Sequence, residues 1–221
     1  LLSRKGSAAE VFANSRDIRA ILPEATDRLQ QSMADTGSAI VSAQRELESM
    51  QRLGIHAMTL FDTCYPQRLL ECDDAPLVLF HCGNTDFNRH HVISMIGTRK
   101  CTEYGRELCH NFVNDLKRLV PDTLIVSGLA YGIDIQSHRA ALETCTDTAA
   151  VLAHGLDTIY PPTHRKSAAD IVHKGGALVT EYPTGTRPEA HNFVHRNRIV
   201  AGMCDACIVV ESAAKGGSLI T

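Results

Sequence analysis

The sequence contains no tryptophan, and aromatic residues make up only 5% of its 221 positions. It also lacks any apolar run near the ~20 residues that a helix needs to cross a bilayer, and its first residues lack the apolar core of a secretory signal peptide. Disorder and a collagen-like structure are excluded too, because hydrophobic residues reach 44% and the glycines follow no period. These absences predict a globular cytoplasmic protein without a membrane partner.

The chain also lacks the paired cysteine spacing of a zinc ribbon. Its eight cysteines are scattered, and a chain of this length does not need disulfides to hold a core, so we expect reduced thiols. Cys204 and Cys207 have the spacing of a zinc or redox pair, but no second pair matches them and they run into a strand-like segment. We interpret them as packing residues and expect neither a metal nor another cofactor.

No strong excess of positive charge marks the chain as a general nucleic-acid binder. The net charge is −3, with nine Lys and Arg against twelve Asp and Glu in residues 1–90, and thirteen of each in residues 91–221. A protein without a basic field can bind an anion only in a local pocket.

The chain has two regions of different character. Residues 1–54 are helical in pattern, with Ser15 and Ser38 as candidate caps and Gly54 as a helix stop. We expect a small N-terminal helical domain at 1–54 and an α/β domain at 55–221. The first residue is not Met, and the last residues read as a loop that enters a helix, so we also expect a piece of a longer protein.

Short apolar segments alternate with helical segments from residue 91 onward. We expect strands at residues 56–60, 76–80, 92–96, 123–126, 148–153, 177–180 and 206–211. We expect helices at residues 102–119, 133–142, 167–173 and 193–203. Helices between continuously apolar strands predict a doubly wound α/β fold with a mainly parallel sheet.

Glycine stands with a hydroxyl or a cation after nearly every predicted strand. Ligands of such sheets bind beyond the carboxyl ends of the strands, and glycines, hydroxyls and arginines there suit a phosphate. The candidates are Gly97, Thr98, Arg99, Ser127, Gly128 and Gly132, the basic loop His164, Arg165 and Lys166, and the terminal loop Lys215, Gly217 and Ser218. The alternative is ordinary turn chemistry, since neither a dinucleotide fingerprint nor a Walker loop is present.

Residues 191–198 form the densest polar cluster of the chain. An aromatic ring beside arginines is how single-stranded nucleic acid is held, by base stacking and backbone charge. The candidates are Phe193, Arg196, Asn197 and Arg198. The alternative is a solvated helix start with one core phenylalanine.

Catalytic patterns are scarce. Glu181 and Glu211 lie at predicted strand ends and could act in acid–base chemistry. No nucleophile elbow and no H-E-x-x-H motif occurs, and no residue stands out as a nucleophile.

Taken together, these spaced blocks resemble the DNA-processing protein A (DprA/Smf) family of bacteria. The blocks cover residues 65–221 almost continuously and include Ile96–Arg99, Ser127–Asp134, Val151–Asp157, Tyr160–Pro161, Glu181–Pro183, Asn192–Phe193, Arg196–Ile199 and Gly217–Thr221. The resemblance implies an extended Rossmann-like domain, preceded by a small helical domain of the SAM or helix-hairpin-helix type. The family continues past Thr221, so we expect an incomplete final sheet edge and dimer surface.

The resemblance also implies a function and a site. The family binds single-stranded DNA without strong sequence preference, forms homodimers, and loads a RecA-type recombinase during natural transformation, with no established catalysis. The DNA pocket would lie at the carboxyl edge of the sheet, with Arg99 in the family's Gly-Ser-Arg step and Ser127, Gly128 and Gly132 cradling a phosphate. A basic residue within 164–166 and the loop 215–218 would complete it.

One enzyme family shares this edge layout. Nucleoside-monophosphate phosphoribohydrolases of the lysine-decarboxylase-like family have the same Rossmann core, and Glu181 or Glu211 would then act as acid or base. Their P-G-G-x-G-T block is not present in this sequence. The enzyme is therefore the alternative hypothesis.

Overall fold

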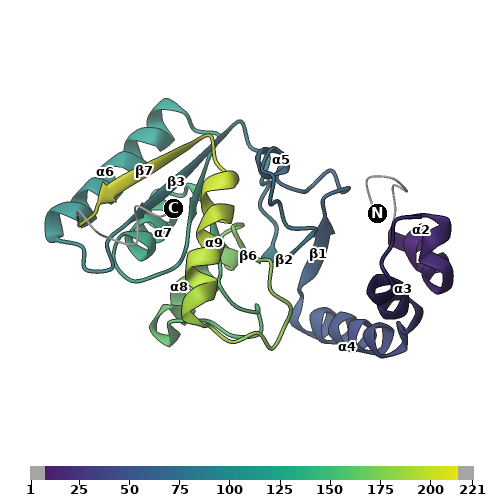
Figure 1. Ribbon diagram of the computed structural model, residues 1–221. Coiled ribbons are helices and arrows are strands. Elements are labelled where there is room, and N and C mark those ends of the chain that lie inside the picture. The colour runs from purple at the N-terminus through teal and green to yellow at the C-terminus, as the bar shows by residue number, and fades with distance from the viewer. Residues whose placement is uncertain (1–7, 214–221) are drawn as a thin grey trace. The chain divides into compact units, whose positions relative to one another are not determined.

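The computed structural model describes residues 8–213 (Figure 1). It separates into two compact units, Leu1–Ser49 and Met50–Thr221, each of which is described by itself. The assignment of the first unit to a SAM or helix-hairpin-helix type stays a prediction.

The first unit is helical. It contains α2 (Ala8–Ala13), the 3-10 helix η1 (Ser15–Ala20), α3 (Asp27–Ala34) and most of α4 (Gly37–Leu53). Its small core consists of Val11, Ile18, Ile21 and Ala25. The predicted cap at Ser15 is wrong: Ser15 is the first residue of the 3-10 helix and is buried, and the preceding Asn14 makes no side-chain cap bond.

The second unit is built on one seven-stranded sheet with the order β1-β2-β6-β5-β4-β3-β7. The strands are β1 (His56–Thr59), β2 (Val78–Gly83), β3 (His91–Gly97), β4 (Thr123–Ser127), β5 (Asp147–Val151), β6 (Ala177–Thr180) and β7 (Ala206–Glu211). Strands β3 to β7 pair in parallel, whereas β1 and β2 join as antiparallel strands. The predicted α/β class with a mainly parallel sheet is therefore confirmed.

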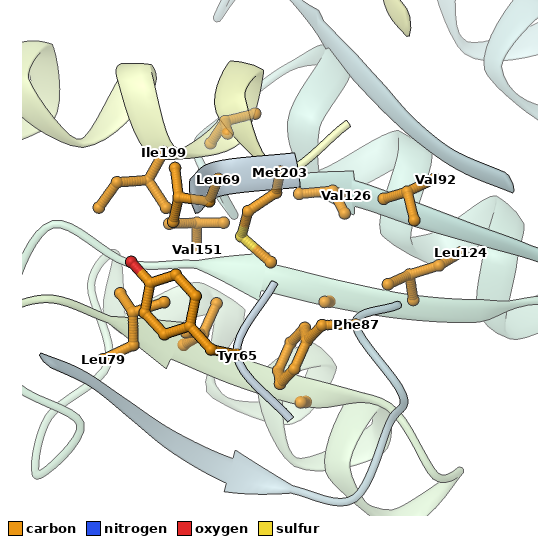
Figure 2. Packing of buried hydrophobic residues seen from close by; sticks show 14 of the residues in the cluster. Tyr65, Leu69, Leu79, Phe87, Val92, Leu124, Val126, Val151, Ile199 and Met203 are labelled. Atoms are coloured by element: carbon orange, nitrogen blue, oxygen red, sulfur yellow. The ribbon is translucent and has the colours of Figure 1, made fainter. Parts of the chain in front are cut away.

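Helices cover both faces of this sheet. They are α5 (Gln67–Leu70), α6 (Glu103–Leu119), α7 (Ile133–Glu143), α8 (Arg165–His173), which follows the 3-10 turn η2 (Pro162–His164), and α9 (Ala190–Gly202). Successive strand residues point to opposite faces. Accordingly Leu124 and Val126 pack with α5 and α9 (Figure 2). Ile125 points to the other face and packs with α6 and α7.

Local sequence signals explain where the site-bearing helices begin. The Thr102 hydroxyl accepts a hydrogen bond from the Gly105 amide at 3.1 Å and caps α6, as its position predicts. Helix α9 begins at Ala190 after the extended Glu189, three residues before the predicted start at Phe193. His191 and Asn192 therefore lie in its first turn.

Three general features bear on the class of protein. No helix within residues 8–213 has the length and apolarity that a bilayer crossing requires. All eight cysteines are free thiols. Across the described ranges, no three His, Cys, Asp or Glu side chains are grouped so that they could hold a metal ion.

Candidate nucleic-acid interface

The strand order reverses at β3, which has β4 on one side and β7 on the other. Ligands of open α/β sheets bind beyond the carboxyl ends of the strands at such a point. Residues Gly97–Arg99 leave β3 there and lie directly against the turn that follows β4. The Ile133 amide donates to the Thr98 carbonyl at 3.1 Å, and the Thr98 amide donates to the Glu211 carbonyl at 2.6 Å.

Gly132 allows this close approach of the two loops. Its φ is +78°, a conformation that L side chains rarely adopt, and a Cβ atom there would overlap the Thr98 carbonyl and the Arg99 backbone. The glycine is thus required by packing, and it sets the path of the chain that carries Arg99.

Arg196 is buried beneath these loops. Only 3% of the residue is exposed, and its Nη1 donates to the Gly128 carbonyl at 2.7 Å and to the Val151 carbonyl. Burial lowers the pKa of the guanidinium, and the charge of Arg99 acts in the same direction, while Asp134 opposes them. This guanidinium binds carbonyl groups inside the protein, and its predicted contact with a phosphate stays a prediction.

The turn after β4 is also satisfied from within. The Gly128 amide donates to the Asp134 carboxylate at 3.2 Å, and the Ser127 hydroxyl donates to the Met95 carbonyl at 2.6 Å. Burial raises the pKa of Asp134, and the charge of Arg196 with the Ala130 and Gly128 amides acts in the opposite direction. The Gly128 amide and the Ser127 hydroxyl therefore hold the turn from within, and their predicted role in cradling a phosphate stays a prediction.

Arg99 is a predicted cation that is exposed at this edge. Its guanidinium carbon lies 5.8 Å from the centre of the Phe193 ring, a cation–π contact. The Phe193 ring in turn lies 5.7 Å from the Tyr160 ring, at an interplanar angle of 58°. A cation and two rings from three separate segments of the chain thus meet at the carboxyl edge.

Two buried histidines hold the connection between β5 and α8, which carries Tyr160. His154 accepts a hydrogen bond from the Tyr160 amide at 3.2 Å, and burial lowers the pKa of its imidazole. His164 donates from Nδ1 to the Leu129 carbonyl at 2.8 Å and is only 4% exposed. The sequence left open which of His164, Arg165 and Lys166 faces the pocket, and the His164 ring is packed in the interior.

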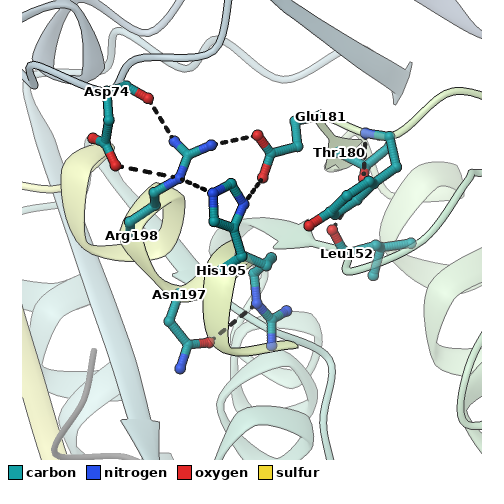
Figure 3. Close-up of polar contacts among 9 residues, drawn as sticks. Asp74, Leu152, Thr180, Glu181, His195, Asn197 and Arg198 are labelled. Carbon is teal, nitrogen blue, oxygen red and sulfur yellow. Dashed lines mark hydrogen bonds and ion pairs between the residues drawn. The ribbon is translucent and has the colours of Figure 1, made fainter. Parts of the chain in front are cut away.

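Arg198 belongs to a separate cluster of charges (Figure 3). It forms ion pairs with Glu181 and with Asp74, and its Nη1 also donates to the Asp74 carbonyl at 2.8 Å. His195 joins the cluster through a 3.0 Å contact with Glu181. Through these acidic partners Arg198 joins β6, α9 and the segment before β2, and its predicted role as a phosphate ligand stays a prediction.

The remaining predicted residues have different positions. Arg165 and Lys166 are exposed in the first turn of α8. Asn197 is half-buried, and its Oδ1 accepts from the Arg196 Nε at 3.3 Å. Lys215, Gly217 and Ser218 lie outside the described residues. Tyr131 and Tyr160 are not among the predicted site residues, although both are exposed at this edge and stand in the Gly-rich turn and the Tyr-Pro step.

The two candidate catalytic acids are engaged within the protein. Glu211 accepts a hydrogen bond from the Thr102 amide at 2.9 Å, at the start of α6. Glu181 is held by Arg198 and His195, as described above. The geometry therefore gives neither carboxylate a free position for acid–base chemistry on a bound nucleotide.

Fold and site together define a class: a Rossmann-type α/β protein with a cationic and aromatic site at the carboxyl edge of its sheet. Residues 56–221 match the sequence profile of the DNA recombination-mediator protein A family. The chain belongs to this family, also named DprA/Smf.

Individual relatives give the same result. The chain is 37% identical to DNA processing protein DprA of Streptococcus pneumoniae over 165 residues, which is 75% of this chain and 57% of the relative. It is 40% identical to protein Smf of Escherichia coli over 157 residues, 71% of this chain and 41% of the relative. The chain thus spans about half the length of these curated relatives.

Solved structures are similar as well. The crystal structure of DprA from Streptococcus pneumoniae superposes with a TM-score of 0.77 at 31% identity, covering 93% of this chain and 69% of that one. A structure of DNA processing protein A from Helicobacter pylori, described as showing a single-stranded DNA binding mode, gives a TM-score of 0.66 at 28% identity. It covers 75% of this chain and 74% of that one.

Proposed function

We propose that this chain binds single-stranded DNA at the carboxyl edge of its sheet and acts as a recombination mediator. The observation that carries the proposal is the guanidinium of Arg99, exposed and held over the Phe193 ring, with Tyr160 packed beside it. The arginine supplies charge for a phosphate, and the rings supply stacking surface for a base.

Arg99 and Phe193 make the direct contacts in this proposal. Thr98, Asn197, Arg165 and Lys166 contribute at the rim, and Lys215, Gly217 and Ser218 contribute from the terminal loop. Gly97, Gly128, Gly132, Ser127, His164, Arg196 and Arg198 act indirectly, because they shape and hold the loops that present Arg99 and Phe193.

The finer role rests on the family. We propose that the full protein loads a RecA-type recombinase onto the bound strand during natural transformation, and that it does so in the cytoplasm as a homodimer. Support comes from membership of the DNA recombination-mediator protein A family and from the described binding mode of the Helicobacter pylori relative.

Fluorescence anisotropy with a labelled oligo-dT tests the site. Arg99→Ala should weaken binding by about 1–3 kcal/mol, the range for a charged hydrogen-bonding contact. Arg118→Ala is the matched control, since Arg118 lies in the last turn of α6, at the opposite edge of the sheet, and pairs with Asp115. Equal affinity of wild type and Arg99→Ala would contradict the site assignment.

We further propose that binding involves no catalytic step. The internal bonds of Glu181 and Glu211 support this view. Incubation of the protein with AMP should leave the nucleotide intact by chromatography, whereas released adenine would favour the phosphoribohydrolase alternative.

A further inference from the structure

Two exposed tyrosines lie at the same edge as Arg99. Tyr131 is 47% exposed in the turn between β4 and α7, and Tyr160 is 44% exposed in the connection that follows β5. Strands β4 and β5 are parallel neighbours, so both segments leave the sheet at its carboxyl edge. An exposed ring beside a cation at this edge offers a face on which an unpaired base can stack.

Both rings are held in place by their neighbours. Tyr131 lies edge-on to the His164 ring, with centroids 5.0 Å apart, and its hydroxyl contacts the Thr163 hydroxyl at 3.4 Å. Tyr160 lies against Phe193. The backbone beneath them is pinned by the bonds of His154 to the Tyr160 amide and of His164 to the Leu129 carbonyl.

The segment from Tyr160 to His164 joins the two contacts. At one end it touches Phe193 on α9, and at the other end it touches Tyr131 in the turn after β4. Two ring pairs, Phe193–Tyr160 and His164–Tyr131, are therefore joined by the backbone from Tyr160 to His164, and the rings of Tyr160 and Tyr131 are the exposed ones. Arg99 supplies a positive charge beside the Phe193 ring.

We propose that Tyr160 and Tyr131 extend the binding site into a platform on which successive unpaired bases stack, with Tyr131 at the end away from Arg99. The inference rests on the proposed function and adds two binding residues to it. Stacking tolerates every base, because each has a π-face, so the platform adds length and affinity without sequence preference. Binding on this platform requires bases, and this requirement distinguishes the platform from a site that binds phosphate alone.

The test compares two labelled 12-mers of equal charge, oligo-dT and an abasic strand, on the wild type and on variants. The wild type should bind oligo-dT more tightly than the abasic strand. Tyr131→Ala and Tyr160→Ala should each weaken oligo-dT binding roughly 5- to 100-fold, the range for loss of one base–aromatic stack. Their affinity for the abasic strand should equal that of the wild type.

Two further variants separate stacking from folding. Tyr131→Phe keeps the ring and should keep the affinity for oligo-dT. Phe112→Ala removes a ring that is 41% exposed in the middle of α6 and should change nothing. Because the chain has no tryptophan and five tyrosines, its tyrosine emission reports stacking directly, and Tyr131→Phe should lower the quenching by oligo-dT without lowering the affinity.

The outcomes are distinguishable from those of the proposed function. If oligo-dT binds and Arg99→Ala weakens it, but both tyrosine-to-alanine variants match the wild type, the platform is wrong and the DNA site stands. If the wild type does not bind oligo-dT at all, the proposed function fails and the platform fails with it.

Discussion

At the scale of single residues, Arg196 differs from its exposed neighbours because it is buried. It stands in a basic run beside Phe193, yet its guanidinium is 3% exposed and binds two main-chain carbonyls. A buried charge is stable only when its donors are satisfied, and here the carbonyls of two neighbouring strand ends satisfy them. We therefore interpret Arg196 as a positioning residue for the turn that contains Gly128.

Arg196→Ala should lower the free energy of unfolding by about 3–5 kcal/mol, because it leaves buried carbonyls and Asp134 without their partner. Urea unfolding followed by circular dichroism measures this change, with Arg118→Ala expected within about 0.5 kcal/mol of wild type. A variant that keeps its stability but loses affinity for oligo-dT would restore Arg196 as a phosphate ligand.

His138 makes the stability depend on pH. Burial, together with the charges of Arg196 and His164, lowers the pKa of its imidazole from 6.5 to about 3. Below pH 6.5 the unfolded chain gains a proton that the folded protein does not take up. The neutral imidazole of His138 therefore contributes fully to stability above pH 6.5. This contribution falls as the pH drops toward 3, by up to about 1.4 kcal/mol per pH unit.

Urea unfolding between pH 7.5 and 5 should show this decline in the wild type. His138→Gln should show a shallower decline, since glutamine cannot be protonated. The comparison isolates His138 from Asp134, whose raised pKa acts in the opposite direction. Identical slopes in the two proteins would refute the assignment.

At the scale of elements, helix α9 points the side chains of one basic cluster toward different parts of the protein. Successive residues of a helix point about 100° apart, so Arg196 and Arg198 diverge by roughly 200°. Arg196 enters the core, Arg198 joins Glu181 and Asp74, and Phe193 reaches the ring of Tyr160. The sequence shows these residues as one cluster, but the helix separates them.

The contact between the loops after β3 and β4 leads to a testable prediction at the scale of elements. A strained φ alone costs about 1–3 kcal/mol. Gly132→Ala should lower the free energy of unfolding by more than this, because a Cβ atom there would also overlap the Thr98 carbonyl. Gly175→Ala is a matched control, since its φ is +90° but a Cβ there meets nothing within 4 Å. Gly132→Ala should also weaken oligo-dT binding by displacing Arg99, and equal melting temperatures of the two variants would contradict this account.

For the whole molecule, the net charge of −3 argues that DNA binding depends on a few local contacts. Each phosphate contact on a single strand adds about 0.7 to the slope of log affinity against log salt. With Arg99, Arg165, Lys166 and Lys215 as contacts, we expect a slope of about −3 for oligo-dT. Arg99→Ala should make the slope shallower by about 0.7, whereas Arg118→Ala should not change it, and a slope that Arg99→Ala leaves unaltered would argue against a phosphate contact.

The sequence by itself determined much of the architecture. Apolar strand segments, the Thr102 cap and the alternation of helix and strand predicted the α/β fold with boundaries close to those observed. Glycines after the strands, with Arg99 and Phe193, also predicted which edge of the sheet carries the candidate site. These signals are local, so a linear reading can find them.

Only the tertiary structure decided which of the predicted site residues face outward. The sequence predicts four residues as phosphate-binding: Ser127, Gly128, His164 and Arg196. In the structure, their polar groups form hydrogen bonds to other groups of the protein. Only the folded structure shows that Tyr131 contacts His164 and that Tyr160 contacts Phe193, at the two ends of the segment from Tyr160 to His164. The physical reason is that side-chain direction and partnership depend on strand order and helix phase, which join residues far apart in the chain.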